Sequence, residues 1–251
     1  MQTLTHQLKS IRLSGMAQKL AIRIQEANAN ELSYLDFLRN LVEDELAVRK
    51  DRLLNRRLKQ ANFPYWRTID QFDFSFNPGI RKRQIQQLAT GMFISNHENI
   101  LLIGPPGVGK THLVVAFGIR AIEHGFAVLY RSVFDIAKET MEKPEQELIA
   151  TYIKPHLLII DELGMKNLNS SAIEILLEVM HRRYQKSSTI IASNRPIEDW
   201  GKILGDNATA SAILDRFLEN VHFIKITGKS YRLKNLNKEK KNPIDSEPVN
   251  S

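Results

Sequence analysis

Gly104-Pro-Pro-Gly-Val-Gly-Lys110-Thr111 is the most informative segment of this sequence. It matches G-x-x-x-x-G-K-[ST] in full, and it stands between an apolar run that ends at Ile103 and an amphipathic stretch. The glycines let backbone N–H groups turn inward around a phosphate, and a helix beginning near Lys110 adds the positive end of its dipole. The segment therefore predicts a phosphate-binding loop between a strand and a helix.

The residue types in this loop predict ATP and Mg²⁺ as cofactors. Lys110 is expected to reach the β and γ phosphates, and the Thr111 hydroxyl is expected to bind Mg²⁺. The alternative, a glycine turn beside an unrelated lysine, is disfavoured because a strand and a helix flank the loop. The residues expected to contact the nucleotide are Gly104, Pro105, Pro106, Gly107, Val108, Gly109, Lys110, Thr111 and His112.

A second segment, Leu157-Leu-Ile-Ile-Asp161-Glu162, is typical of a Walker B strand. An apolar strand ending in acids is a weak signal alone. It becomes a strong indication of a Walker B strand here because it lies about 50 residues beyond the phosphate loop. Asp161 is expected to hold Mg²⁺ through water, and Glu162 is expected to act as general base toward the attacking water. The alternative is a pair of solvated acids at a strand end.

Short apolar runs alternate with amphipathic stretches from about residue 80 to residue 227. Buried runs of four or five residues alternating with helices indicate a parallel sheet with helices on both faces. The strand expected between the two motifs, together with the Asp-Glu pair, favours P-loop folds with an inserted strand. The expected strands are 100–103, 126–130, 157–161, 189–192 and 222–226, and the expected helices lie near 80–95, 110–124, 133–142, 170–185 and 208–219.

Three later polar residues are candidates for the same site. Asn194 follows the fourth expected strand and can bond the attacking water and the γ phosphate, although Asn is also common in turns. Arg216, on an expected helix, and Arg232, after the last strand, are candidates for charge neutralisation. The alternative for each arginine is a surface ion pair, for example Arg216 with Asp215 or Glu219.

The first 60 or so residues have helical periodicity. A helix is expected to begin at Ser33, with Asp36 as its capping-box partner, and to end before Pro64. Its buried face is expected to be Leu35, Leu38, Val42 and Leu46, and its far end is basic, with Arg49, Lys50, Arg52, Arg56, Arg57 and Lys59.

An aromatic-rich linker follows this helix and ends near Pro78. Phe72 and Phe74 in it have two interpretations: they cover the adenine, or they belong to the core, which base rates favour.

Composition narrows the class of protein further. The chain has 251 residues, 43% of them hydrophobic, and a formal charge of +7, which is compatible with a phosphate-rich partner. It has no cysteine, which excludes disulfides, zinc–thiolate sites and cysteine nucleophiles. No apolar run approaches the roughly 18 residues of a membrane span, and no signal peptide is evident. We expect a cytoplasmic protein without a membrane partner.

The ordered motifs resemble those of the IstB-like ATPases, AAA+ proteins that help insertion-sequence transposases and are relatives of the DnaC and DnaI helicase loaders. The resemblance covers the whole chain, including LKSIRLSGMAQKL near the N-terminus and FDFSFNPGI in the linker. The motifs that carry it are GPPGVGKTHL, LLIIDELG, RYQKSST, IIASNRP, DW, GD, AILDRF and GKSYR.

The resemblance implies an α/β fold of the AAA+ P-loop type, with a parallel five-stranded sheet flanked by helices and no full C-terminal lid. The sequence pattern and the resemblance together predict four parts: a helical N-terminal oligomerisation or partner domain at 1–62, a linker at 63–79, the ATPase core at 80–234 and a basic, disordered tail at 235–251.

The resemblance also implies roles. Asn194 matches a sensor residue, Arg216 an arginine finger supplied to a neighbour's ATP, and Arg232 a late sensor arginine. The segment 133–147 is expected to face DNA, with Arg131, Lys138 and Lys143 as its positive residues, although a solvated helix face is the alternative for each. The implied function is an ATPase that assembles on double-stranded DNA, mainly through backbone contacts, as a ring or filament-like oligomer. It would assist its cognate transposase in target selection and transposase activation.

Three rival functions stay open. A DnaC/DnaI-like replicative helicase loader shares every catalytic motif and differs in the N-terminal domain. A protein-unfolding AAA+ machine needs an aromatic-glycine pore loop, but residues 132–154 contain no glycine. A nucleotide-gated scaffold with little turnover would not need Glu162.

Overall fold

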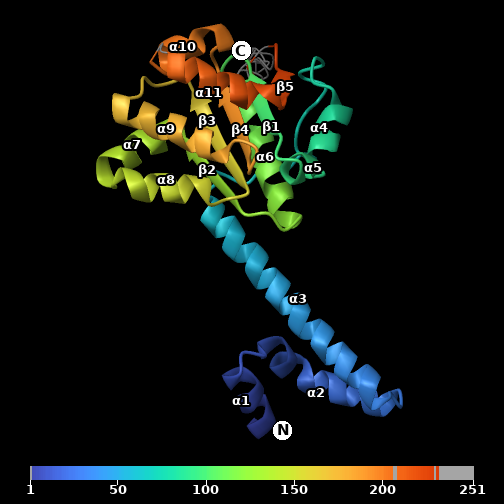
Figure 1. Cartoon of the computed structure of the whole chain (residues 1–251). Coiled ribbons are helices and arrows are strands. Elements are labelled where there is room, and N and C mark those ends of the chain that lie inside the picture. The colour runs from blue at the N-terminus through green and yellow to red at the C-terminus, as the bar shows by residue number, and fades with distance from the viewer. Residues whose placement is uncertain (1, 206–207, 229, 232–251) are drawn as a thin grey trace, which may run out of the picture. The chain divides into compact units, whose positions relative to one another are not determined.

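The computed structural model describes residues 2–205, 208–228, 230 and 231, with the backbone only at 208–210 and 213 (Figure 1). Arg232 and the tail expected at 235–251 lie outside the described residues. The chain divides into two compact units, Met1–Lys59 and Gln60–Ser251. Within the described part of the chain, no helix is both long and apolar enough to cross a bilayer.

Helices form the first unit, as predicted: α1 (Gln2–Ser10), α2 (Ser14–Ala29) and α3 (Tyr34–Ala61). At the start of α3 the Asp36 N–H donates to Ser33 Oγ at 3.2 Å, and the Ser33 hydroxyl donates to the Asp36 carboxylate at 2.6 Å. The helix ends before Pro64, where Asn62 adopts a left-handed φ of 58° that stops the helical hydrogen bonding.

The predicted buried face of α3 is wrong. Glu45, only 4% exposed, packs on α2 instead: its Oε2 accepts the N–H groups of Gly15 at 2.6 Å and Met16 at 3.2 Å. This polar cap, together with the buried Leu41, sets which side of α3 meets α2. The four residues predicted to be buried are exposed instead: Leu35 by 66%, Leu38 by 54%, Val42 by 39% and Leu46 by 60%.

A five-stranded parallel sheet forms the centre of the second unit. Its strand order is β2-β3-β4-β1-β5, so β4 lies between the strand of the phosphate loop and the strand of the acidic pair. The fold class predicted from the sequence, with its inserted strand, is confirmed. The strands are β1 (Asn99–Ile103), β2 (Val128–Ser132), β3 (Leu157–Leu163), β4 (Ser188–Ser193) and β5 (Val221–Lys225).

Helices cover both faces of this sheet, because alternate strand residues point to opposite sides. Leu158 and Ile160 belong to the buried cluster that also contains residues of α7, α8, α9 and α11. Ile159 faces the other way, where it approaches Gly118 of α6. The helices are α4 (Lys82–Leu88), α5 (Met92–Ser95), α6 (Lys110–Glu123), α7 (Val133–Glu142), α8 (Glu145–Ile153), α9 (Ser170–Arg183), α10 (Trp200–Ile203) and α11 (Ala208–Glu219), with a 3₁₀ turn η1 (Ile197–Asp199).

Two helical predictions need correction. The single helix expected near 80–95 is the pair α4 and α5, because Gly91 between them adopts φ 78°. Helix α8 was not predicted; Pro144 stands at its N-cap and separates it from α7.

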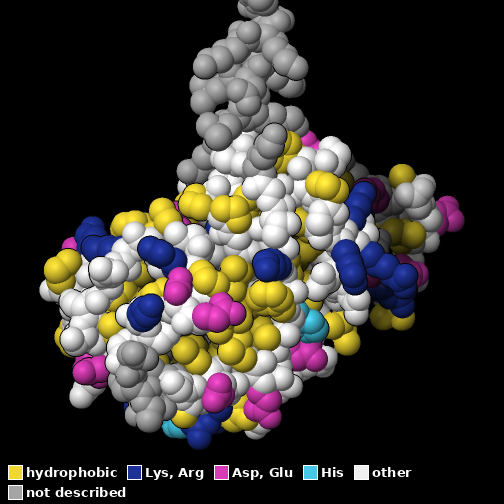
Figure 2. All heavy atoms as spheres, turned by 90° about the horizontal axis from the view of Figure 1, so that it is seen from above, with side chains coloured by type: hydrophobic (Ala, Val, Ile, Leu, Met, Phe, Trp, Pro, Cys, Tyr) yellow, Lys and Arg dark blue, Asp and Glu magenta, His cyan; other side chains and the backbone are white. Residues whose placement is uncertain are grey.

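On the face seen in Figure 2, acidic, basic and apolar side chains are interspersed.

Candidate nucleotide site

The phosphate loop joins β1 to α6 and needs glycine at two positions. Gly107 and Gly109 adopt φ of 80° and 103°, the region that other residues rarely adopt. Their surroundings also exclude a side chain. A Cβ on Gly109 would lie 2.7 Å from the Phe72 ring, and one on Gly107 would lie 2.1 Å from Ser230 Oγ. The loop is thus enclosed by segments that are distant from it in sequence.

The side chain of Lys110 folds back onto the backbone of the phosphate loop. Its side chain is buried, and its Nζ donates to the carbonyl oxygens of Gly104 at 2.7 Å and Pro105 at 2.9 Å. These carbonyls hold the ammonium group at the start of α6, where the helix dipole also favours an anion. A phosphate bound by the loop would therefore meet a fixed positive charge.

Asp161 is fully buried at the end of β3, and its carboxylate lies close to the Thr111 hydroxyl. Its Oδ1 accepts the Glu162 N–H at 2.7 Å, and its Oδ2 accepts the Tyr130 hydroxyl at 3.0 Å. Burial raises the pKa of Asp161, while its interactions with Thr111, Glu162 and Tyr130 act in the opposite direction. The structure thus brings together the two residues predicted to hold Mg²⁺.

Thr111 and Asp161 offer Mg²⁺ ligand atoms of the right element, oxygen, and as many protein ligands as Mg²⁺ usually has. Mg²⁺ takes oxygen ligands and is usually held by one or two protein groups together with substrate phosphates and waters. Among the described residues, no cluster of three or more His, Cys, Asp or Glu could hold a metal without such help. The donor set fits a metal that arrives with a nucleotide.

Glu162 lies on a strained and irregular part of β3. Its φ is 62°, and the pairing of β3 with β4 shifts register between Ile160 and Leu163. A non-glycine residue in this conformation costs about 1–3 kcal/mol, and such residues gather at functional sites. The bulge interrupts the alternation of the strand, so Asp161 and Glu162 are not simply on opposite faces of the sheet.

Asn194 follows β4, next to the acidic pair. Ile103 of β1 pairs with Ser193 of β4, so Asn194 and the phosphate loop leave neighbouring strands at the same edge. The Asn194 Oδ1 is buried without a hydrogen-bond partner among the described residues. A buried unpaired oxygen indicates a place for a donor, such as a water. Gly164, with φ 89°, leaves space for the Asn194 side chain, because a Cβ added at this position would lie 3.0 Å from Asn194 Oδ1.

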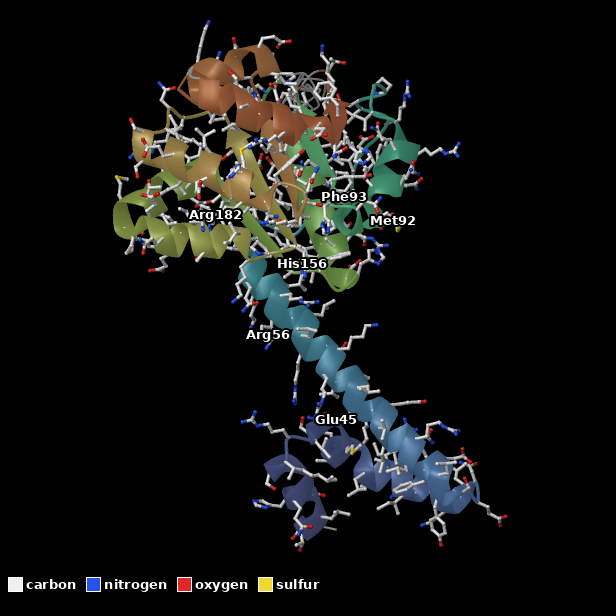
Figure 3. The ribbon with its side chains drawn as sticks, in the orientation of Figure 1. Glu45, Arg56, Met92, Phe93, His156 and Arg182 are labelled. Atoms are coloured by element: carbon white, nitrogen blue, oxygen red, sulfur yellow. The ribbon has the colours of Figure 1, made fainter. Side chains whose placement is uncertain are left out.

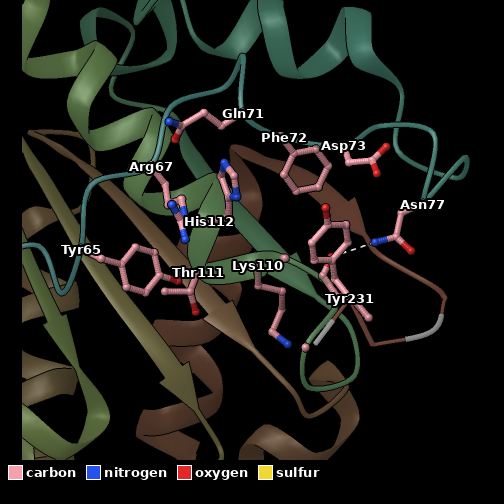
Figure 4. A pocket seen from close by; sticks show the side chains of 13 residues that line it. Tyr65, Arg67, Gln71, Phe72, Asp73, Asn77, Lys110, Thr111, His112 and Tyr231 are labelled. Carbon is pink, nitrogen blue, oxygen red and sulfur yellow. Dashed lines mark hydrogen bonds between the residues drawn. The ribbon is translucent and has the colours of Figure 1, made fainter. Parts of the chain in front are cut away.

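A cavity of about 300 Å³ adjoins the loop (Figure 4). Figure 4 shows linker side chains along one side of it, with Lys110 and Thr111 below them. Its lining residues are Tyr65, Arg67, Gln71, Phe72, Asp73, Asn77, Gly107, Val108, Gly109, Lys110, Thr111, His112 and Tyr231.

The linker and the segment after β5 are fastened to the loop itself. Asn77 Nδ2 donates to the Val108 carbonyl, and the Tyr231 N–H donates to the Gly107 carbonyl, both at 2.9 Å. His112, predicted to contact the nucleotide, lines the cavity, and its Nε2 lies 2.8 Å from the Thr68 carbonyl. Burial lowers the pKa of His112.

The core interpretation of Phe72 is confirmed, and its contact with the adenine stays a prediction. Its side chain is buried, with its ring centroid 5.2 Å from that of His112, and it also lines the cavity. Phe74 packs behind it at 4.9 Å between ring centroids.

Of the other predicted loop residues, Gly104 and Pro105 accept hydrogen bonds from the Lys110 ammonium, and Pro106, which follows them, is exposed. The motifs do not predict the polar and aromatic lining residues outside them; the aromatic-rich linker is the signal that the sequence offers for these residues. They are Tyr65, Arg67, Gln71, Asp73, Asn77 and Tyr231.

Arg216 does not belong to the cavity of its own chain. It is exposed in the last turn of α11, where its Nη1 lies 3.1 Å from His181 Nδ1 and its guanidinium lies 5.8 Å from the centre of the Tyr184 ring. The alternative ion pair with Asp215 or Glu219 does not form among the described residues.

The basic residues expected to face DNA near 133–147 are all paired with acids. Arg131 and Lys143 both contact Glu139, at 3.1 and 3.4 Å, and Lys138 contacts Glu142 at 3.7 Å. Their charges are therefore largely compensated within the chain.

The strand order, the phosphate loop and the Asp161–Thr111 pair define a P-loop nucleotide-binding protein of the AAA+ type. Solved structures agree on the fold. The crystal structure of DnaI matches with a TM-score of 0.54 and 19% identity, covering 65% of this chain and 89% of that one. AMPPCP-bound DnaA from Aquifex aeolicus matches with a TM-score of 0.55 and 20% identity, covering 71% and 56%.

The family model described as IstB-like ATP binding protein matches residues 6–239. The chain belongs to this family. An insertion sequence IS21 protein from Pseudomonas aeruginosa, named for ATP binding, is 37% identical over 93% of this chain and 89% of its own length. The corresponding IS5376 protein from Geobacillus stearothermophilus is 36% identical over 89% and 91%.

Proposed function

We propose that this protein is a Mg²⁺-dependent ATPase that hydrolyses ATP to ADP and phosphate, binds double-stranded DNA as an oligomer and assists a transposase. The proximity of Thr111 to Asp161, beside the buried Lys110, is the observation that carries the ATPase proposal. It joins two separate motifs into the donor set that a metal–nucleotide complex requires.

Each residue has a defined part in this proposal. The loop N–H groups and Lys110 bind the phosphates, and Thr111 and Asp161 hold the metal. A bound Mg²⁺ neutralises phosphate charge. Glu162 accepts a proton from the attacking water, and Asn194, whose Oδ1 is unpaired, orients that water. Arg216 of a neighbouring copy supplies further positive charge, and Arg232 is proposed as a sensor of the bound state.

Two substitutions separate binding from turnover. Lys110→Ala is expected to lose productive ATP binding. Glu162→Gln is expected to retain the affinity for a fluorescent ATP analogue and to lose hydrolysis, because the amide cannot accept the proton. Full ATPase activity in purified Glu162→Gln would exclude Glu162 as the general base.

The DNA-related part of the proposal is supported by the relatives, which come from insertion sequences, and by the formal charge of +7. We expect ATP-strengthened binding to duplex DNA of any sequence. Its affinity should fall steeply as salt rises, because each neutralised phosphate releases counterions. Binding to a random duplex, measured with ATP at several salt concentrations, tests this: no binding or a flat salt response contradicts it.

A replicative helicase loader is the second candidate, because DnaI shares the fold. The insertion-sequence relatives match 89–93% of the chain, including the N-terminal unit, which favours the transposition role. A transposition assay with an insertion-sequence transposase, run with and without this protein, distinguishes the two: a helper is required for target insertion, and a loader is not.

A further inference from the structure

A second cavity, of about 340 Å³, lies at the edge of the sheet opposite the nucleotide site. Its residues precede β3 and β4, whereas the phosphate loop follows β1, and all these strands are parallel. We call it the basic cavity; its lining residues are Ile153, Lys154, Pro155, His156, Arg182, Lys186 and Ser187. His156 and Arg182 are labelled in Figure 3.

The polar side chains of the basic cavity are basic or neutral, and no carboxylate lines it. Lys154 and Lys186 are exposed, and neither forms an ion pair within the described part of the chain. Arg182 alone is compensated, by Glu178 at 2.5 Å. This differs from the 133–147 segment, where each basic residue named above has an acidic partner.

His156 adds a donor without needing a charge. Its Nδ1 accepts the Ala127 N–H at 2.9 Å, so Nδ1 cannot carry the ring proton. In the neutral ring the proton is therefore on Nε2, which makes that nitrogen a hydrogen-bond donor. The cavity thus combines ammonium, imidazole N–H and hydroxyl donors from two loops.

A buried arginine holds these two loops in place. Arg183 is 2% exposed; its Nη1 donates to Pro155 O at 2.8 Å, and its Nη2 donates to Ser188 O at 2.5 Å. Further bonds reach Tyr152 O and Thr189 Oγ1. Burial lowers the pKa of Arg183 to about 9, which leaves it protonated at neutral pH. Arg183 therefore fixes the backbone beside Lys154 and Lys186 and adds its own positive charge beneath them.

We propose that the basic cavity binds backbone phosphates of duplex DNA, which locates a DNA contact of the function proposed above and rests on it. Uncompensated lysines on two pre-organised loops match an extended polyanion, and phosphate contacts carry no base preference. The lining residues include no Phe, Tyr or Trp on which a base could stack, which disfavours a free nucleotide as the occupant.

The test compares two double variants that lose the same charge. Lys154→Ala/Lys186→Ala removes the two lysines of the basic cavity, and Lys82→Ala/Lys202→Ala removes two exposed lysines elsewhere. Binding of each ATP-loaded protein to random duplexes is measured over a salt series. The cavity variant is expected to lose about two units of the slope of log affinity against log salt, equally for duplexes of different sequence. The control variant should keep the wild-type slope.

The outcomes distinguish the two proposals. If wild-type protein binds no duplex, the DNA-binding function itself fails, and the cavity assignment fails with it. If wild type binds and the cavity variant keeps its slope, only the cavity assignment is overturned. Thermal melting and ATP-analogue affinity should be unchanged in both variants, and Lys154→Arg/Lys186→Arg should restore the slope; loss of the slope in this charge-preserving variant also contradicts the proposal.

Discussion

Tyr130, at the centre of β2, donates its phenolic hydrogen to Asp161 Oδ2 at 3.0 Å, although the two residues lie on neighbouring strands outside any shared motif. The Tyr130 ring is buried and packs edge-to-face on Phe63 at 6.2 Å between centroids. The bond leaves the carboxylate with a fixed orientation toward Thr111. Tyr130 is thus a positioning residue for the proposed metal ligand.

Tyr130→Phe is expected to weaken the response to Mg²⁺ while leaving the fold intact, since the ring remains against Phe63. A lost hydrogen bond to a carboxylate is worth about 1.5 kcal/mol, so the Mg²⁺ concentration for half-maximal nucleotide binding should rise by about tenfold. Tyr152→Phe is the matched control, because Tyr152 is equally buried and donates to Glu139 outside the site. Equal Mg²⁺ responses in both variants would show that Tyr130 has no positioning role.

Gly164→Ala is expected to slow hydrolysis more than it weakens ATP binding. The new Cβ would lie 2.5 Å from Arg195 Cγ and 3.0 Å from Asn194 Oδ1, so Asn194 must move. The left-handed φ of 89° adds about 1–2 kcal/mol of strain. Gly125→Ala, at φ 91° in a turn outside the site, controls for strain alone. ATPase rates at saturating ATP decide: equal losses in the two variants mean that Asn194 is not involved.

Arg216→Ala is expected to leave ATP binding nearly intact and to abolish DNA-stimulated turnover. The side chain is exposed and does not line its own cavity, so its removal disturbs little within the chain. An arginine supplied by a neighbour contributes about 10³–10⁵ in rate, whereas surface ion pairs contribute about 0–1 kcal/mol. Arg120→Ala, another exposed arginine, is the control.

Mixing Arg216→Ala with Lys110→Ala is the direct test of action in trans. Some interfaces in mixed oligomers would combine an intact phosphate loop with an intact Arg216. Turnover should therefore recover in part at intermediate ratios. If two folded variants that co-assemble recover no activity at any ratio, Arg216 does not act on a neighbour.

Acid should loosen the start of α2. Burial alone would raise the pKa of Glu45, but the bonds from Arg49, Gly15 and Met16 outweigh it, so its pKa is below the ordinary 4.5. The stabilisation is therefore present above about pH 4.5 and is lost as the pH falls through the lower folded value. Amide protection factors at Gly15–Leu20 should be flat above about pH 5 and fall below it.

Glu45→Gln should reduce that pH dependence and lower the stability of this helix start by about 1 kcal/mol, the usual effect of a lost cap. Glu43→Gln, an exposed neighbour on α3, should change neither. The same acid response in both variants would mean that another carboxylate is responsible.

The contiguous parts of the site were predictable because their chemistry is local. A phosphate loop needs glycines, a lysine and a hydroxyl in immediate succession, and Asp161 and Glu162 end one apolar strand. Helix α7 begins and ends where predicted, since Ser132 and Asp135 form its capping box. Buried apolar runs likewise indicated every strand of the sheet to within two or three residues.

Other features arise only when the chain folds back on itself. The buried side of α3 depends on Glu45, which accepts hydrogen bonds from the free N–H groups at the start of α2. The hydrophobic periodicity of α3 does not predict this contact. Three features of the site join residues that are distant in sequence. They are the cavity wall from Tyr65 to Asn77, the contact of Tyr231 with the phosphate loop, and the bond from Tyr130 to Asp161. Sequence by itself determined the fold class and the phosphate-binding chemistry, because those rest on residue types at fixed spacing. Tertiary structure decided the orientation of Asp161, the bulge at Glu162 and the grouping of Lys154 with Lys186, because each depends on which strands become neighbours.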